Sequence, residues 1–374
     1  MLNRHGWTTL VLGLLAGAAG RVFGLIELYV LSAAAILCVL WSLLAVRRPL
    51  PLLSVSRVSV PAVVPVGEPA RVDLRVGNSG RRRSPHLQLW ESVGSRGGAP
   101  MQLASLRVGE SATAAYRVPT SRRGAIQVGP LRAEVGDQLG LCRRSLVLAS
   151  RSEVLVVPRI VALTMPSSGS AGRLGQHLRS KSWGQSGGEF HALREYAAGD
   201  DPRSINWKAS ARSTGLIVRE STIEGLARVM IVLDDAATQY TEESWEHAVS
   251  AAASLVAAAQ VSGLDVRLIS GSLEVRGPDV VTRSLRQLAT AAPSELGVQA
   301  MVAATGSDGL GLVVVVTGSA TSSAAAHARS MATNDDVFVV VTCTEYPVGN
   351  GFCADGTSPE SLQASWNMLA IGNE

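Results

Sequence analysis

The sequence predicts a membrane-anchored protein that consists of a transmembrane helical hairpin, an immunoglobulin-like β-sandwich and a doubly wound α/β domain. Three observations support this fold class: an apolar run from Trp7 to Val46, short alternating runs from about Leu52 to Arg159, and strand–helix alternation towards the end of the chain. The predicted boundaries are 1–50 for two transmembrane helices, 51–162 for the β-sandwich, 163–225 for a linker and signature segment, and 226–374 for the α/β domain.

The apolar run is broken only by Arg21 and Glu27, and it divides into Trp7–Gly20 and Leu25–Val46. At 1.5 Å per residue, the second stretch is long enough to cross the roughly 30 Å of hydrocarbon in a bilayer. The shorter first stretch spans only if Arg21 extends to the interface. The simplest topology is a hairpin that enters the bilayer and returns.

A cleaved signal peptide is an alternative for the first stretch, because Arg4 and His5 precede an apolar run and a small-residue Ala16-Gly-Ala18 site. Both alternatives give the same orientation. Arg47 and Arg48 follow the second stretch, and positively charged flanks remain on the cytoplasmic side. We therefore expect a multi-pass protein of the cell membrane with cytoplasmic soluble domains.

The region after the hairpin has the pattern of half-buried strands. In Arg71-Val-Asp-Leu-Arg-Val76, apolar side chains alternate with charged ones. Seven further runs of this kind are separated by Gly, Pro, Ser and Asn: Val55–Val60, Leu87–Trp90, Met101–Val108, Ala112–Val118, Gly124–Val135, Leu141–Leu148 and Val154–Val157. Their number and spacing predict a β-sandwich of immunoglobulin-like type.

The last region alternates apolar, β-branched strands with helices. The predicted strands are Val229–Leu233, Val266–Ile269, Leu312–Val316 and Val337–Thr342. A helix between the first two begins at the N-cap Thr241 and ends at Gly263, and its inward stripe comprises Trp245, Ala248, Ala252, Leu255, Val256 and Ala259. Further helices fit Asp279–Ala291, Thr321–Met331 and Pro359–Leu369. This alternation predicts a parallel, doubly wound sheet.

Pro166 to Gly188 reads as a linker, because Ser and Gly dominate it and it contains no acid. Its Gly184-Gln-Ser-Gly-Gly188 fits the Gly-x-Ser-x-Gly of α/β-hydrolases. A nucleophile elbow requires a strand before the serine and a helix after it, however, and Ser186 lies in a Gly/Ser tract.

The stretch from Gly187 to Glu220 concentrates charge, aromatic surface and turn residues. Gly199-Asp-Asp-Pro202 predicts a turn. Three acids stand among four bases here, with two aromatic residues beside them: Glu195, Asp200 and Asp201; Arg194, Arg203, Lys208 and Arg212; Tyr196 and Trp207.

Three interpretations of this stretch stay open. The stretch is an ion-pair brace, that is, an irregular segment held on a neighbouring domain by its charges and by Tyr196 and Trp207 as anchors. Alternatively, it is a docking surface for a protein partner, or a catalytic or metal site. Paired arginines and carboxylates fit the brace, which makes burial of Asp201 and Arg203 the expectation. Acids among this many arginines have lowered pKa values and are poor general acids, which disfavours a hydrolase that uses Glu195, Asp200 and Asp201.

Three motifs of the stretch resemble the family called domain of unknown function 58 (DUF58): Arg194-Glu-Tyr196, Gly199-Asp-Asp-Pro-Arg203 and Ile205-Asn-Trp-Lys-Ala-Ser-Ala-Arg212. Upstream, Asp137-Gln-Leu-Gly-Leu141 stands where that family usually has Asp-Pro-Phe-Gly-Leu. The resemblance implies that the signature residues are Arg194, Glu195, Tyr196, Gly199, Asp200, Asp201, Arg203, Asn206, Trp207, Lys208, Ser210 and Arg212. It also implies a scaffold or assembly role together with a MoxR-type AAA+ ATPase.

Leu233-Asp-Asp-Ala-Ala-Thr238 resembles a departure from the von Willebrand factor type A motif Asp-x-Ser-x-Ser, which holds a divalent cation. Asp234 and Thr238 fit that motif, but Ala236 replaces a hydroxyl. A later strand end reads Thr317-Gly-Ser319 and lacks the usual acid. We therefore expect a degenerate type A-like domain without metal or cofactor, and a cation-dependent adhesion module is the alternative.

Composition and motifs exclude several other classes. The net charge is +4, but only 17% of residues are charged and no basic face carries interleaved aromatics, so nucleic acid is not an expected partner. The four cysteines and six histidines form no metal-ligand spacing. The sequence has no phosphate-binding loop, dinucleotide fingerprint or His-Glu-x-x-His motif. A non-enzymatic protein whose partners are another protein and the lipid bilayer is the resulting prediction.

Overall fold

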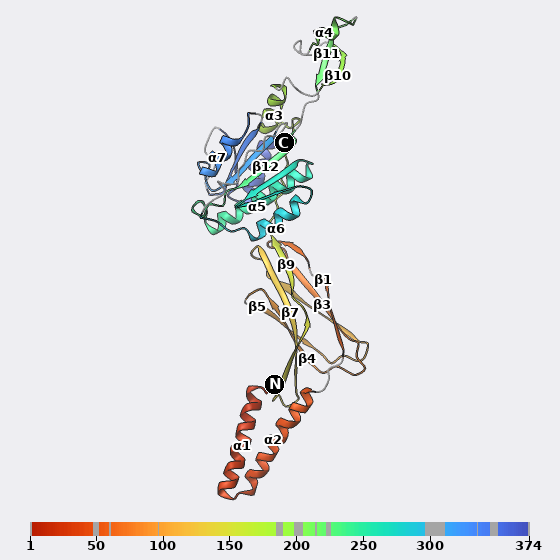
Figure 1. Cartoon of the computed structure of the whole chain (residues 1–374), viewed down its shortest axis with the longest axis vertical. Coiled ribbons are helices and arrows are strands. Elements are labelled where there is room, and N and C mark those ends of the chain that lie inside the picture. Colours follow the sequence, from red (N-terminus) through yellow and green to blue (C-terminus); the bar gives the residue numbers. More distant parts are fainter. Residues whose placement is uncertain are drawn as a thin grey trace. The chain divides into compact units, whose positions relative to one another are not determined.

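The structure is a computed structural model that describes residues 2–47, 52–59, 61–95, 97–184, 190–197, 205–213, 215–221, 226–295, 311–334, 336–344 and 351–372. The chain divides into two compact units, Met1–Val156 and Val157–Glu374. The first unit contains a helical pair and a β-rich domain, and the second contains an α/β domain and a small hairpin (Figure 1).

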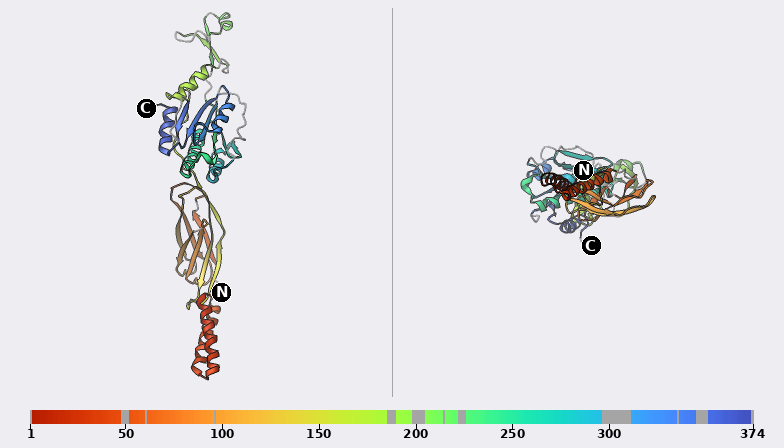
Figure 2. Two further views of the ribbon diagram at one scale, coloured as in Figure 1. Left: turned by 90° about the vertical axis from the view of Figure 1, so that its left-hand side faces the viewer. Right: turned by 90° about the horizontal axis from the view of Figure 1, so that it is seen from below.

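Helices α1 (Arg4–Phe23) and α2 (Ile26–Arg47) form an antiparallel pair, whose members lie next to each other in Figure 1 and one in front of the other in the left view of Figure 2. Both are long and apolar enough to cross a membrane. The helices begin and end within a few residues of the predicted stretches. Gly24, in the left-handed conformation, ends α1, and its N–H donates to the carbonyl of Gly20.

Small residues line the contact between the two helices. A Cβ at Gly13 would lie 2.8 Å from Cβ of Ala35, and a Cβ at Gly17 would lie 2.8 Å from Oγ of Ser32. Gly13 and Gly17 are four residues apart, which is the Gly-x-x-x-Gly spacing that lets two helix backbones approach closely within a bilayer. The pair is therefore held by close backbone packing while its large apolar side chains point outward.

The β-rich domain consists of two sheets. One sheet has the order β1 (Leu53–Ser59), β3 (Ala70–Asn78), β6 (Ser111–Val118). The other has the order β2 (Val63–Pro65), β9 (Ser152–Val157), β7 (Gly124–Gly136), β4 (Leu87–Val93), β5 (Gly97–Leu103), and β8 (Arg143–Ala149) pairs with β7. Buried positions alternate along β3, as the sequence predicts. The short strand β2 was not predicted.

The two sheets face each other across an apolar core. Leu74 and Val76 of β3 belong to the same buried cluster as Leu89 of β4 and Leu131 of β7. A second cluster joins Val72 of β3 to strands of the other sheet, including Val128 and Val154. This two-layer packing makes the domain a β-sandwich.

A buried ion pair joins the two layers. Nε and Nη2 of Arg57, on β1, donate to Oε1 of Glu91, on β4, at 3.1 and 2.6 Å. Arg57 also donates to Oγ of Ser152 at 2.6 Å. The Glu91 side chain is 0% exposed. Burial, together with the neighbouring Glu91 carboxylate, raises the pKa of Tyr116.

The second unit is built around a six-stranded sheet of order β14 (Leu273–Arg276), β13 (Asp265–Ser270), β12 (Arg228–Leu233), β15 (Gly311–Thr317), β16 (Val337–Thr342), β17 (Phe352–Asp355). All neighbouring strands are parallel except β14, which is antiparallel to β13. The prediction of an all-parallel sheet is therefore wrong at this edge. A single turn, which contains Gly271 at φ 59°, connects β13 to β14 without a crossover helix.

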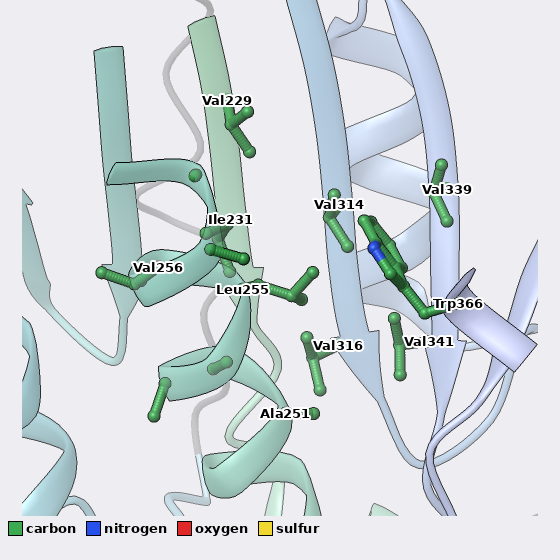
Figure 3. Close-up of a cluster of buried hydrophobic side chains, with 14 of the residues drawn as sticks. Val229, Ile231, Ala251, Leu255, Val256, Val314, Val316, Val339, Val341 and Trp366 are labelled. Atoms are coloured by element: carbon green, nitrogen blue, oxygen red, sulfur yellow. The ribbon is translucent and has the colours of Figure 1, made fainter. Parts of the chain in front are cut away.

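Helices cover both faces of this sheet. On one face, α5 (Glu242–Val261), α6 (Val280–Thr290) and α8 (Pro359–Ala370) contribute to one large core cluster. Figure 3 shows Leu255 of α5 facing the sheet and Trp366 of α8 beside Val314 and Val339. On the other face, α7 (Ser323–Met331) packs its alanines against β12, β13 and β15. The predicted inward stripe of α5 is confirmed as buried.

The interpretation of 166–188 as a linker is wrong for most of that range. Residues Arg173–Gly184 form helix α3, and its Leu174 and Leu178 are buried in the core of the α/β domain. Lys181 Nζ donates to the carbonyl oxygens of Asn334 and Asp336 at 2.7 and 2.6 Å. Leu174 and Leu178 are one helical turn apart and therefore lie on the same face of α3. The Ser- and Gly-rich composition of the region did not indicate this apolar face.

We expect Glu91→Ala to destabilise the β-sandwich by about 3–5 kcal/mol, because it leaves the Arg57 guanidinium buried without its partner. Asp73→Ala is the matched control, since its pair with Arg71 is exposed and contributes about 0–1 kcal/mol. Urea unfolding of the full chain in detergent, followed by circular dichroism, measures both. Equal losses in the two variants would contradict the structural role of the buried pair.

Candidate functional site

The signature stretch folds as a two-stranded hairpin with a short helix inserted before its second strand. Strand β10 (Phe190–Glu195) pairs antiparallel with β11 (Ile217–Ser221), and Glu195 lies opposite Ile217. The Tyr196 N–H donates to the carbonyl of Leu216 at 2.8 Å, which extends the pairing beyond the strands. The hairpin lies between α3 and β12 in the chain (Figure 1).

Two signature residues shape the inserted helix α4 (Trp207–Ser210). Asn206 is its N-cap, and its Oδ1 accepts a hydrogen bond from the Ala209 N–H at 3.1 Å. Ser210 Oγ accepts from the Ile217 N–H at 2.8 Å and donates to the Asn206 carbonyl at 3.0 Å. The Asn206 N–H donates to the Ile217 carbonyl at 2.8 Å. Asn206 and Ser210 therefore hold α4 against β11 through backbone groups.

The same motif directs other side chains outward. Trp207 is 67% exposed, and Lys208 and Arg212 are also exposed. Tyr196 and Glu195 are exposed at the end of β10. The anchoring role that the ion-pair brace gives to Tyr196 and Trp207 stays a prediction. The stretch separates into residues that build its backbone and residues that it presents to solvent.

Part of the predicted site lies outside the described residues, namely Gly199, Asp200, Asp201 and Arg203. Arg194 lies on β10 opposite Val218. The predicted ion-pair brace, which depends on Asp201 and Arg203, stays a prediction. The structure brings together Asn206, Ser210, Trp207 and Lys208.

A second polar cluster lies at the carboxyl ends of the α/β strands. The order of the sheet reverses direction between β12 and β15, and ligands in open α/β sheets bind at such a switch point. Asp234 follows β12, and its Oδ2 accepts a hydrogen bond from Oγ1 of Thr317, the last residue of β15, at 2.9 Å. Its Oδ1 accepts from the Ala236 N–H at 3.2 Å. Both carboxylate oxygens of Asp234 are thus engaged by the protein.

Asp235 has a different environment from its neighbour. It is 4% exposed, and its Oδ1 has no hydrogen-bond partner among the described residues. Burial, with a further contribution from the charge of Asp234, raises the pKa of the Asp235 carboxyl. The Tyr240 hydroxyl closes the cluster by donating to the Asp234 carbonyl at 2.7 Å, and burial raises the pKa of Tyr240.

The sequence pattern did not indicate Tyr240 in this cluster, or the buried Asp355 at another strand end of the same edge. Asp355 ends β17 and is buried, and its Oδ1 accepts hydrogen bonds from the N–H and hydroxyl of Thr357. The signal was a short apolar run that ends in an acid, Phe352-Cys-Ala-Asp355. Among the described residues, no group of three or more His, Cys, Asp or Glu side chains could hold a metal ion. The metal-free interpretation stays a prediction.

Comparison with known proteins identifies the family. Residues 192–346, which include most of the described hairpin and most of the α/β sheet, match the family described as "Protein of unknown function DUF58". This match supports membership of the DUF58 family and confirms the resemblance carried by the signature motifs. No curated protein matches the chain.

Solved structures match a part of the chain at low identity. The CARDB domain of the PF1109 protein from Pyrococcus furiosus, in complex with di-metal ions, is 19% identical, and the match covers 29% of this chain and 90% of that one with a TM-score of 0.22. A β-glucosidase from Listeria innocua in complex with isofagomine is 14% identical, covering 28% of this chain and 16% of that one with a TM-score of 0.19. These scores are too low to support an argument, and the strand pairing itself defines the β-sandwich.

We expect millimolar magnesium or manganese to leave the Tm of the purified protein unchanged, because a ligand that does not bind the native state cannot stabilise it. The reason lies in the two hydrogen bonds that already engage the Asp234 carboxylate. Differential scanning fluorimetry measures the shift. A rise that disappeared in Asp234→Ala would establish a cation site and support the adhesion alternative.

We expect Asp235→Asn to raise the Tm at neutral pH. The pKa of this carboxyl is higher in the folded than in the unfolded chain, so its stabilising contribution is complete below the ordinary carboxyl pKa and is lost as pH rises through the folded-state pKa. The gain in Tm should therefore shrink as the pH falls towards the ordinary carboxyl pKa. Asp234→Asn is the control and should lower the Tm at neutral pH, because it weakens two hydrogen bonds. Tm changes of the same sign in both variants would contradict the different environments of Asp234 and Asp235.

Proposed function

We propose that this protein is a membrane-anchored, non-enzymatic scaffold or assembly factor that docks a protein partner through its β10–α4–β11 hairpin. One observation carries the proposal. Asn206 and Ser210 bond the backbone of α4 and β11, and Trp207 and Lys208 are thereby held in solvent on a fixed turn of helix. A preformed backbone lowers the entropy that binding must overcome.

The exposed side chains suit a protein partner. Trp, Tyr and Arg are the residue types enriched among those that dominate binding energy at protein interfaces. Trp207, Tyr196 and Arg212 supply all three types within one short segment, and all three are exposed. Isolated apolar surface residues need no explanation, but an exposed tryptophan beside two cations is a suitable anchor for a partner pocket.

We infer a MoxR-type AAA+ ATPase as the partner, because the resemblance to the DUF58 family implies it. In this proposal the ATPase supplies the chemical energy and this chain supplies position and contact. No catalytic step is assigned to the chain. Of the acids that a hydrolase would use, Glu195 has an exposed side chain at the end of β10.

We further infer that the α/β domain is von Willebrand factor type A-like and without metal. Its strand order and the position of Asp234 at the switch point support the likeness. Gly318 occupies the position after Thr317 where an acid is usual in such domains, and a Cβ there would collide with the Gln239 carbonyl.

The proposed anchor is the α1–α2 hairpin. Its outward side chains are apolar, and Trp7 and Trp41 are exposed towards the end of the pair that carries Arg4 and Arg47. Tryptophan favours the membrane–water interface, and arginine after a span favours the cytoplasmic side. We therefore propose a multi-pass protein of the cell membrane whose soluble domains are cytoplasmic.

We expect Trp207→Ala and Lys208→Ala in the full chain to weaken binding of the purified MoxR-type ATPase by at least about 2 kcal/mol for the tryptophan, the threshold for a dominant interface residue. Both residues are exposed, so the Tm should not change. Leu273→Ala is the matched control, because Leu273 is an exposed apolar residue at the β13–β14 turn. Unchanged binding of the ATPase by Trp207→Ala would contradict the proposal that the β10–α4–β11 hairpin docks the partner.

We expect reporter fusions at the C-terminus to be active in the cytoplasm, because Arg47 and Arg48 follow the second span. Parallel fusions to alkaline phosphatase and to a fluorescent protein report the two compartments. A fusion that is active in the periplasm and silent in the cytoplasm would exclude a cytoplasmic ATPase as the partner.

A further inference from the structure

Several loops of the β-sandwich lie at the same end of the domain. The start of β1 lies opposite the end of β3, with Leu53 paired to Asn78. In the other sheet, the pairing of Leu87 with Leu103 and of Gln88 with Glu134 places the start of β4 with the ends of β5 and β7. The loops at this end are therefore 79–86, 104–110 and 137–142.

Hydrogen bonds join the loops of the two sheets. Asn78 Nδ2 donates to the carbonyls of Arg82 and Leu106 at 2.8 and 3.1 Å. Ser84 Oγ accepts from the Leu106 N–H at 2.9 Å, and Ser105 Oγ donates to the Ser84 carbonyl. Loops 79–86 and 104–110 consequently form one structured surface.

The same end of the sandwich contacts the apolar helices. Ser42 Oγ, near the end of α2, donates to Oδ2 of Asp137 at 2.6 Å. The Asn3 N–H, at the start of α1, donates to the Leu141 carbonyl at 2.9 Å, and Leu2 forms a bridge with Cys142. A Cβ at Gly6 would collide with the Leu141 carbonyl. These contacts place the loops next to the helix ends that carry Arg4 and Arg47.

This helix-proximal surface is basic and carries exposed apolar tips. Its exposed arginines are Arg81, Arg82, Arg83 and Arg107. Val108 is 58% exposed and Leu139 is 53% exposed. Among the described residues, no ion pair neutralises the four arginines. Glu110 is the acid of loops 79–86 and 104–110, and its carboxylate accepts a hydrogen bond from the Arg107 N–H.

Asp137 does not offset this positive charge towards a ligand, because its carboxylate is turned inward. Oδ1 accepts from the Cys142 N–H at 2.6 Å, and Oδ2 accepts from the Leu139 N–H at 3.0 Å in addition to the Ser42 hydroxyl. The turn that these bonds fix leaves Leu139 exposed at its tip. The segment Asp137–Leu141 thus forms a turn against the helix ends.

The geometry points to a lipid-binding surface: loops 79–86, 104–110 and 137–142 contact the bilayer face, with Arg81, Arg82, Arg83 and Arg107 on anionic phospholipid headgroups and Leu139 and Val108 in the interfacial layer. This inference rests on the proposed membrane anchor, which brings the surface to the bilayer. Clusters of arginine next to a span attract the anionic lipids of the cytoplasmic leaflet, and the attraction falls off within a Debye length. Headgroup binding would hold the sandwich against the membrane.

The first test measures Tm for the full chain in nanodiscs of phosphatidylcholine, with or without phosphatidylglycerol, at low and high salt. We expect phosphatidylglycerol to raise the Tm at low salt and the rise to shrink at high salt. The test variant should lose most of the rise; it carries Arg81→Gln, Arg82→Gln and Arg83→Gln. The control variant removes the same charge from exposed strand positions and should keep the rise; it carries Arg75→Gln, Arg117→Gln and Arg132→Gln. Equal behaviour of the two variants would overturn the inference.

The second test measures depth. A nitroxide is placed at Leu139→Cys or at the control position Val147→Cys, an exposed site within β8, in a chain that also carries Cys38→Ser and Cys353→Ser. In nanodiscs with phosphatidylglycerol, position 139 should collide more with oxygen and less with a water-soluble nickel chelate than position 147. Equal collision ratios in a chain that resists alkaline carbonate extraction would overturn the lipid surface alone. Release of the chain by carbonate would overturn the anchor and this inference together.

Discussion

The burial of the central strands on both faces is the constraint that orders the second unit. Every residue of β15 is buried, and β12 and β16 are nearly as enclosed. Helices must therefore cover both faces, and α3 is recruited to this task despite its polar composition. Polar side chains can enter such a sheet only where a strand ends. This requirement gathers Asp234, Thr317 and Asp355 at one edge.

The β10–α4–β11 hairpin contains no strand that must be buried on both faces, and it can therefore combine two roles. Its backbone hydrogen bonds are satisfied locally by β10–β11 pairing and by Asn206 and Ser210. Large side chains such as Trp207 are consequently not required for a core and are presented to solvent. A signature motif that mixes backbone-binding and outward residues is what a preformed docking segment requires.

In the first unit, the charged side chains that bond within the protein and the arginines that face solvent lie in different places. Arg57 and Glu91 satisfy each other between the sheets, and Asp137 is satisfied by Ser42 and by backbone N–H groups. The arginines of loops 79–86 and 104–110 remain exposed at the end that contacts the helices. The buried pair stabilises the sandwich, whereas the exposed group is available for an external anion.

The sequence by itself determined the helical hairpin, most strands, the capped helix α5 and the family, because these depend on local periodicity and on contiguous motifs. Only the tertiary structure decided the rest. It buried α3 through Leu174 and Leu178, turned β14 antiparallel, exposed Trp207 and paired Arg57 with Glu91. Each of these features depends on a contact between residues that are far apart in the sequence. Local composition carries no information about which distant residues come into contact. The roles of Asn206 and Ser210 likewise depend on contact with Ile217, which only the closed hairpin provides.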